Sequence, residues 1–193
     1  MLQAPRAVFA ALRPDDDESA QARQEPILAL CVLAGIAGVL STGVAARLLD
    51  DPALDNVTVA LWAFVGGALY GVVGYWIAGA LVYGAARGFG SLGSYRRARH
   101  IVGFAAAPLA LSLFVVWPVG LAVFGSDLFR TGGSDSGAGG EVFDAAQLAF
   151  VGWSAGLLVI GVRAVHGWSW PRAAATVAVA TAPLALLFVA ERL

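Results

Sequence analysis

The sequence predicts an all-α polytopic membrane protein with five transmembrane helices, built as one lead helix followed by two repeated helical hairpins. Three observations support this fold class: an apolar composition, five uncharged stretches of membrane-spanning length, and an internal repeat. The chain has 193 residues, of which 59% are hydrophobic and 13% are charged, whereas about a quarter of the residues in soluble domains are charged. Its mean hydropathy is +0.77. This composition excludes an ordinary soluble domain and favours helices, which pair their backbone polar groups internally in lipid.

Five stretches of the chain contain no Asp, Glu, Lys or Arg. A helix needs roughly 17 to 25 apolar residues to cross the hydrocarbon core, and a longer one can tilt. We therefore expect one five-helix transmembrane domain over residues 27–193, preceded by a tail of residues 1–26. The expected spans are residues 27–46, 57–86, 101–124, 145–162 and 173–190.

The two predicted hairpins repeat each other in sequence. Residues 97–111, RARHIVGFAAAPLAL, and 172–186, RAAATVAVATAPLAL, are identical at 9 of 15 positions. The preceding segments, 76–84 (WIAGALVYG) and 153–161 (WSAGLLVIG), share 6 of 9 positions. The offset is 75 residues in the first pair and 77 in the second, so only the connecting loop changed length. This pattern predicts the duplication of a helical hairpin.

Charge and amphipathicity predict how the chain sits in the membrane. Pro5, Val8, Phe9 and Leu12 share one face of a helix, which predicts a short interfacial helix on the inner leaflet; a disordered tail is the alternative. With the N-terminus inside, nine of the 12 basic residues, all of them arginine, fall on the inner side, as the positive-inside rule expects. We therefore predict a multi-pass protein of the cell membrane with a cytoplasmic tail and an external C-terminus.

Glycines and prolines within the spans predict where helices pack and bend. Small-xxx-small pairs let helices approach closely, and we expect such packing at Gly67/Gly71 and Gly152/Gly156. Proline removes a backbone donor and clashes with the preceding turn. Helix kinks are therefore predicted at Pro108, Pro118 and Pro183.

Residues 88–93, GFGSLG, match the GxGxxG pattern of dinucleotide sites. That fingerprint works only between a strand and a helix, so we interpret the match as accidental. Backbone amides at the start of the third span lie beside three arginines and are candidates for a lipid phosphate contact; an ordinary basic loop is the alternative. These arginines are Arg96, Arg97 and Arg99.

Residues 152–156, GWSAG, match the GxSxG pattern of serine hydrolases. The nearest histidine in sequence, His166, lies roughly 18 Å from Ser154 along the same helix, beyond the reach of a general base. The spans also lack internal ionisable residues, which argues against a proton- or ion-coupled pump. We predict a non-enzymatic protein without catalytic, cofactor or metal residues and without nucleic-acid binding. The expected partners are membrane lipids, with other membrane proteins or a homo-oligomer as candidates. A channel or transporter and an intramembrane serine hydrolase are the alternative functions.

Residues 88–111, GFGSLGSYRRARHIVGFAAAPLAL, resemble the Yip family of Rab-interacting multispanning membrane proteins, including its prokaryotic members. In that family a glycine-containing inner loop leads into a span with an aromatic residue and a proline, supplied here by Phe104 and Pro108. The opening residues 5–9, PRAVF, are similar to the short leader of prokaryotic members. The resemblance implies a membrane-organising or interaction role. Relatives with a long cytosolic N-terminal region are linked to GTPase binding and membrane traffic.

Overall fold

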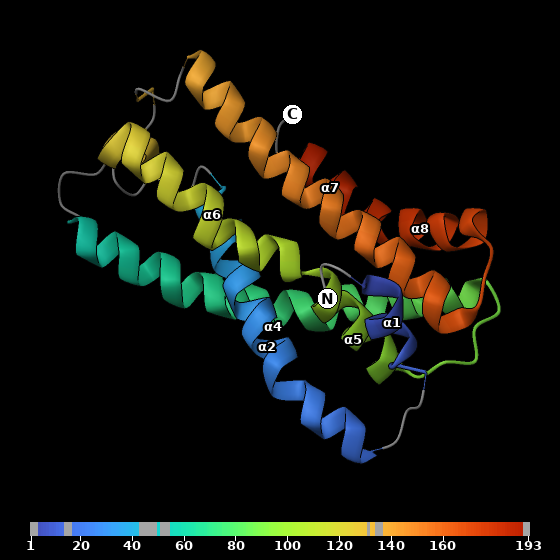
Figure 1. The fold of residues 1–193 in the computed structure, drawn as a ribbon. Coiled ribbons are helices and arrows are strands. Elements are labelled where there is room, and N and C mark those ends of the chain that lie inside the picture. The colour runs from blue at the N-terminus through green and yellow to red at the C-terminus, as the bar shows by residue number, and fades with distance from the viewer. Residues whose placement is uncertain are drawn as a thin grey trace. The chain divides into compact units, whose positions relative to one another are not determined.

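The computed structural model describes residues 4–13, 17–42, 50, 55–130, 132–133 and 137–190, and for 17–20, 56, 126, 184–185 and 187–190 it describes only the backbone. All regular elements in these ranges are helical, as the sequence predicts (Figure 1). They are α1 (Pro5–Ala10), α2 (Asp17–Leu40), α4 (Asn56–Gly88), α5 (Tyr95–Ala105), α6 (Ala107–Phe124), the 3-10 helix η1 (Gly125–Phe129), α7 (Ala138–His166) and α8 (Trp170–Ala190).

Four helical segments in the described ranges are long and apolar enough to cross a membrane. They overlap the first four predicted spans. The fifth predicted span, residues 173–190, falls within α8, which is not among the four. The chain is thus an all-α protein with the candidate membrane spans Gln21–Leu40, Val57–Gly88, Tyr95–Phe124 and Ala138–His166.

The helices α2 and α7 have boundaries that differ from the predicted ones. The helix α2 begins at Asp17, before the predicted start at residue 27, and ends at Leu40 rather than at 46. The hydroxyl groups of Ser41 and Thr42 donate to the carbonyl oxygens of Ala37 and Val39 over 2.8 and 2.6 Å. These bonds satisfy acceptors that a helix end leaves open. The helix α7 begins at Ala138, so the predicted connector before residue 145 is partly helical.

The third predicted span consists of two helices, α5 and α6, with the break at Ala106. Pro108 occupies the first turn of α6, where its missing N–H has no helical partner to lose. Pro118 and Pro183 lie inside α6 and α8 without interrupting them. Pro108 is buried and Pro183 is exposed, although the two occupy equivalent positions of the sequence repeat.

The chain divides into two compact units, and α2, α4 and α7 each contribute to both. Unit 1 comprises Met1–Ile27, Gly74–Ala105 and Ala155–Leu193. Unit 2 comprises Leu28–Val73 and Ala106–Ser154.

Glycines bring α2 and α4 close together in unit 2, where the two helices cross (Figure 1). A Cβ atom on Gly67 would lie 2.5 Å from the Ile36 Cα, and one on Gly71 would overlap the Cys31 carbonyl oxygen. Neither position has space for a side chain. The sequence pattern at Gly67 and Gly71 thus coincides with a close helix contact.

The other predicted glycine pair has no such neighbour. Gly152 and Gly156 on α7 are exposed, and no described atom lies within 4 Å of a Cβ built on either one. The packing predicted there is therefore absent from the described part of the chain. A small-xxx-small pattern shows that a helix can be approached closely, but it does not specify a neighbour.

The core of unit 1 includes the helix α1. Phe9 is 0% and Leu12 is 2% exposed, and both belong to one cluster with residues of α5, α7 and α8. A Cβ on Gly161 of α7 would lie 2.7 Å from Ile101 Cγ2 and 2.9 Å from Phe9 Cε1. Phe9 and Leu12 therefore pack against protein, although the sequence predicted that their face of the helix lies on a leaflet.

Three pairs of positions that correspond in the sequence repeat are buried alike in unit 1. On α5 and α8 these positions face inward with the same spacing, which is the helical period of a buried stripe. The buried pairs are Ala98 and Ala173, Ile101 and Thr176, and Ala105 and Ala180.

Candidate functional site

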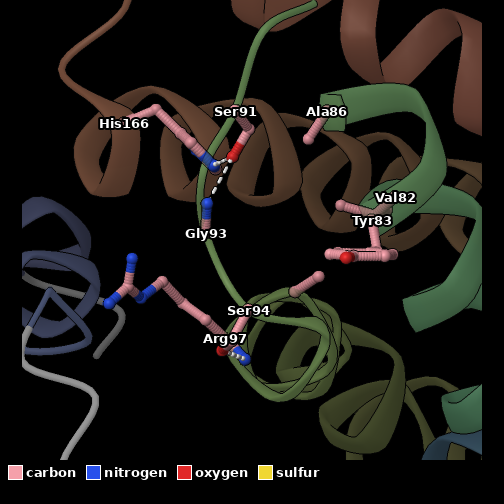
Figure 2. A pocket seen from close by; sticks show the side chains of 9 residues that line it. Val82, Tyr83, Ala86, Ser91, Gly93, Ser94, Arg97 and His166 are labelled. Carbon is pink, nitrogen blue, oxygen red and sulfur yellow. Dashed lines mark hydrogen bonds between the residues drawn. The ribbon is translucent and has the colours of Figure 1, made fainter. Parts of the chain in front are cut away.

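The loop between α4 and α5 is held against the end of α7 (Figure 2). Ser91 Oγ lies 2.8 Å from His166 Nε2 and accepts the Gly93 N–H over 3.0 Å. His166 Nδ1 lies 2.9 Å from the Val162 carbonyl oxygen. Because a carbonyl oxygen only accepts, Nδ1 carries a proton, and in the neutral ring Nε2 accepts the Ser91 hydroxyl. Ser91 and His166 thus tie the loop to α7.

A serine hydroxyl at this distance from a histidine also has the geometry of a nucleophile and its base. The cavity beside the pair is lined by Ser91, Gly93, Arg97 and His166, among others, and has a volume of about 10 Å³. One water molecule needs about that much space. Among the described residues, this cavity therefore holds about one water molecule and is too small for an organic substrate.

The N-terminal segment joins the same region through two arginines. The Arg13 Nε–H donates to the Ala164 carbonyl oxygen on α7 over 2.9 Å, and Arg97 Nη2 donates to the Arg13 carbonyl oxygen over 2.8 Å. The Arg97 side chain extends from α5 toward the N-terminal segment (Figure 2). From the start of α8, Arg172 donates to the Phe89 carbonyl oxygen. Three segments far apart in the sequence therefore lie together in unit 1.

Five arginines of unit 1 lie over aromatic rings, with the guanidinium carbon 3.7 to 5.7 Å from a ring centroid. This is the range of a cation–π interaction. Arginine beside Trp and Tyr is also typical of a membrane–water interface. We call these side chains the arginine–aromatic layer. It consists of Arg6 and Arg163 on Trp170, Arg87 on Tyr83, Arg99 on Trp76 and Arg172 on Trp168.

Arg99 is the most enclosed member of the layer and is only 9% exposed. Its guanidinium carbon lies 3.7 Å from the ring centroid of Trp76, 5.0 Å from that of Tyr95 and 5.4 Å from that of Tyr75. Tyr95 is fixed by its hydroxyl, which donates to the Trp76 carbonyl oxygen over 2.8 Å. Gly79 makes room for the arginine, because a Cβ there would overlap Arg99 Cγ. We call this arrangement the Arg99 cage.

The three arginines predicted to contact one lipid phosphate have different neighbours. Arg97 bonds to the N-terminal segment, whereas Arg99 lies in its cage against α4. The Nε and Nη1 atoms of Arg99 are buried and have no hydrogen-bond partner among the described residues. Arg96 is half-buried. The structure therefore does not bring Arg97 and Arg99 to a single site, and it singles out Arg99.

Sequence reasoning missed two parts of this site. Ser91 and His166 are 75 residues apart, and no local pattern connects them. The cage also joins two helices, with Gly79 and Trp76 on α4 and Tyr95 on α5. The sequence predicted these helices as a hairpin but did not predict which of their residues meet. In the sequence repeat, Gly79 and Trp76 are equivalent to Gly156 and Trp153. The repeat alone does not predict that the two pairs have different surroundings.

Comparison with known proteins gives a family for the chain. Residues 1–191 match the family described as the Yip1 domain. No curated protein and no solved structure matched. The family match covers nearly the whole chain and confirms the resemblance seen at residues 88–111. Together with the four candidate spans, it shows that this multi-pass membrane protein belongs to the Yip1 domain family, whose members are generally non-enzymatic proteins of membrane traffic.

Proposed function

We propose that this protein is a non-enzymatic membrane organiser that spans the cell membrane five times and associates with anionic lipid head groups on the cytoplasmic side. The observation that supports the proposal is the arginine–aromatic layer. It combines fixed positive charge with Trp and Tyr rings, which are favoured at the level of lipid head groups. An anionic leaflet attracts each such charge by about 1 kcal/mol.

The five-span topology is supported by the contacts among the N-terminal segment, the α4–α5 loop and the α7–α8 turn. If the second, third and fourth predicted spans each cross the membrane, these three segments lie on the same side of it. The helix α8 starts in the arginine–aromatic layer and has 21 residues, a length of roughly 30 Å, which is enough to cross the hydrocarbon core. The C-terminus then lies outside.

The lipid association is tested by reconstituting the full chain into vesicles of phosphatidylcholine, with or without phosphatidylglycerol. Spin-labelled lipids report which head groups occupy the shell around the protein. We expect phosphatidylglycerol to be enriched at low salt and less so at high salt, because exposed charges are screened. The variant Arg130→Gln, outside the layer, serves as the control and should retain the enrichment.

Equal association of both lipids at low salt would contradict the proposal. Solute flux through the reconstituted protein, measured on the same vesicles, would instead support the channel or transporter alternative.

A further inference from the structure

We infer that the Arg99 cage is a specific site for one phosphate group, in addition to the general attraction of the layer for anionic lipid. The inference rests on the proposed function only in placing the cage at a membrane surface. It is carried by a cation that is nine-tenths buried, enclosed by three aromatic rings, and without an acceptor for its buried N–H groups among the described residues.

The cage satisfies only part of what a buried guanidinium requires. Aromatic rings attract the cation through their faces, but the N–H groups of arginine point outward in its plane and need acceptor atoms. Burying a charge is costly unless it is paired and hydrogen-bonded. For Arg99 the structure supplies the rings, while Nε and Nη1 have no partner in the part of the chain described. An external acceptor of negative charge completes the site.

Phosphate is the ligand class that matches the donor groups of Arg99. The planar donors of arginine match phosphate oxygens. Arg99 lies in the second turn of α5, roughly 6 Å along the axis from Tyr95, at the beginning of the candidate span Tyr95–Phe124. Lipid phosphates lie at that level of a bilayer. On the adjoining surface of α4, Trp76 is 45% and Ile77 is 50% exposed, which provides an apolar contact for an acyl chain.

The repeat predicts that the site occurs once in each chain. The residue equivalent to Arg99 in the second hairpin is Ala174, and the residue equivalent to Gly79 is Gly156. The second hairpin therefore lacks the cation, and the space at Gly156 is open. One bound phosphate per chain is the expected stoichiometry.

The test is native mass spectrometry of the full chain in detergent, titrated with short-chain phosphatidylglycerol, a diacylglycerol that lacks the phosphate group, or inorganic phosphate. We expect one phosphatidylglycerol per chain, bound roughly 10- to 100-fold more tightly than the diacylglycerol, because the charged hydrogen bond to the phosphate is lost with the diacylglycerol. Failure of inorganic phosphate to compete identifies the lipid as the source. Competition by inorganic phosphate supports the phosphate site but assigns it to a free anion. Absence of a preferred single phosphatidylglycerol would overturn the inference.

Variants assign the binding to the cage. Arg99→Gln should lose the single-site preference, while Arg130→Gln, an exposed arginine with the same charge change, should bind within about twofold of the parent chain. If Arg99→Gln does not fold, Arg99→Lys keeps the cation in the cage but lacks the planar donors, and a loss of roughly tenfold is expected. Parent-like affinity in whichever of the two variants folds would overturn the inference.

The two proposals fail separately. Vesicle enrichment that survives Arg99→Gln, with loss of the single site in detergent, supports both. A single Arg99-dependent site without any enrichment in vesicles contradicts only the proposed function. Enrichment in vesicles without a single Arg99-dependent site contradicts only the inference.

Discussion

At the scale of single residues, glycines with the same sequence pattern have opposite surroundings. Gly71 abuts the Cys31 carbonyl oxygen and the Val32 Cα, whereas the surroundings of Gly156 are open. Gly71→Ala should therefore lower the free energy of unfolding by about 1 to 3 kcal/mol through overpacking. Gly156→Ala should be neutral or raise it by up to about 1 kcal/mol through helix propensity. Thermal unfolding in detergent measures both, and equal losses would show that Gly156 also has a close neighbour.

Ser91 offers a second prediction at this scale. Its hydroxyl bonds to His166 and accepts the Gly93 N–H, so Ser91→Ala should cost about 1 kcal/mol in unfolding free energy and leave cellular function intact. Ser154→Ala, the serine of the GxSxG pattern, is the matched comparison and should also retain function. Detergent stability and complementation of a deletion strain provide the readouts. A stable serine variant that reproduces the deletion phenotype would contradict the non-enzymatic role.

At the scale of elements, the start of α4 depends on a charged cap. The Thr58 N–H donates to Asp55 Oδ1 over 2.6 Å, and this bond lowers the pKa of the Asp55 carboxyl below its ordinary value. A carboxyl whose folded pKa is depressed contributes stability above its unfolded pKa, and the contribution is lost as the pH falls through the folded pKa. The protection factor of the Thr58 amide, which is its exchange rate corrected for the intrinsic pH dependence, should therefore fall on acidification. In Asp55→Asn, which keeps an oxygen cap without a titrating group, this fall in the protection factor should disappear.

The helix α1 is an integral part of the core of unit 1. Phe9→Ala removes a fully buried ring beside Gly161 and Ile101 and should cost about 3 to 5 kcal/mol. Limited proteolysis should then cleave the N-terminal segment more readily. Val8→Ala, at a half-buried neighbouring position, is the control and should have a smaller effect. Unchanged stability of Phe9→Ala would instead support a helix lying on the leaflet.

At the scale of the whole molecule, topology is the decisive property. Leu92 is 93% exposed in the α4–α5 loop, and Ser136 lies in the connector between the third and fourth predicted spans, outside the described residues. In a Cys31→Ser background, Leu92→Cys should label from the cytoplasmic face and Ser136→Cys from the outer face. Labelling of both by an impermeant reagent in intact cells would exclude the five-span topology.

The class of this protein follows from its amino-acid sequence, because uncharged apolar stretches of this length are stable in lipid as helices. The sequence also placed the first four candidate spans and, through residues 88–111, the family. Ala98 and Ala173 occupy equivalent positions of the sequence repeat, and both are buried. The spacing of small and apolar residues along the chain therefore predicts which face of these helices is buried.

The contacts of those helices, in contrast, depend on how the whole chain folds. The glycine patterns at Gly71 and Gly156 are alike, yet one adjoins a neighbouring backbone and the other has open space. Arg97 and Arg99 are two residues apart, yet one bonds to the N-terminal segment and the other is enclosed by rings. Such differences depend on which face of each helix meets which neighbour, and that register is set by packing over the whole chain rather than by any local pattern.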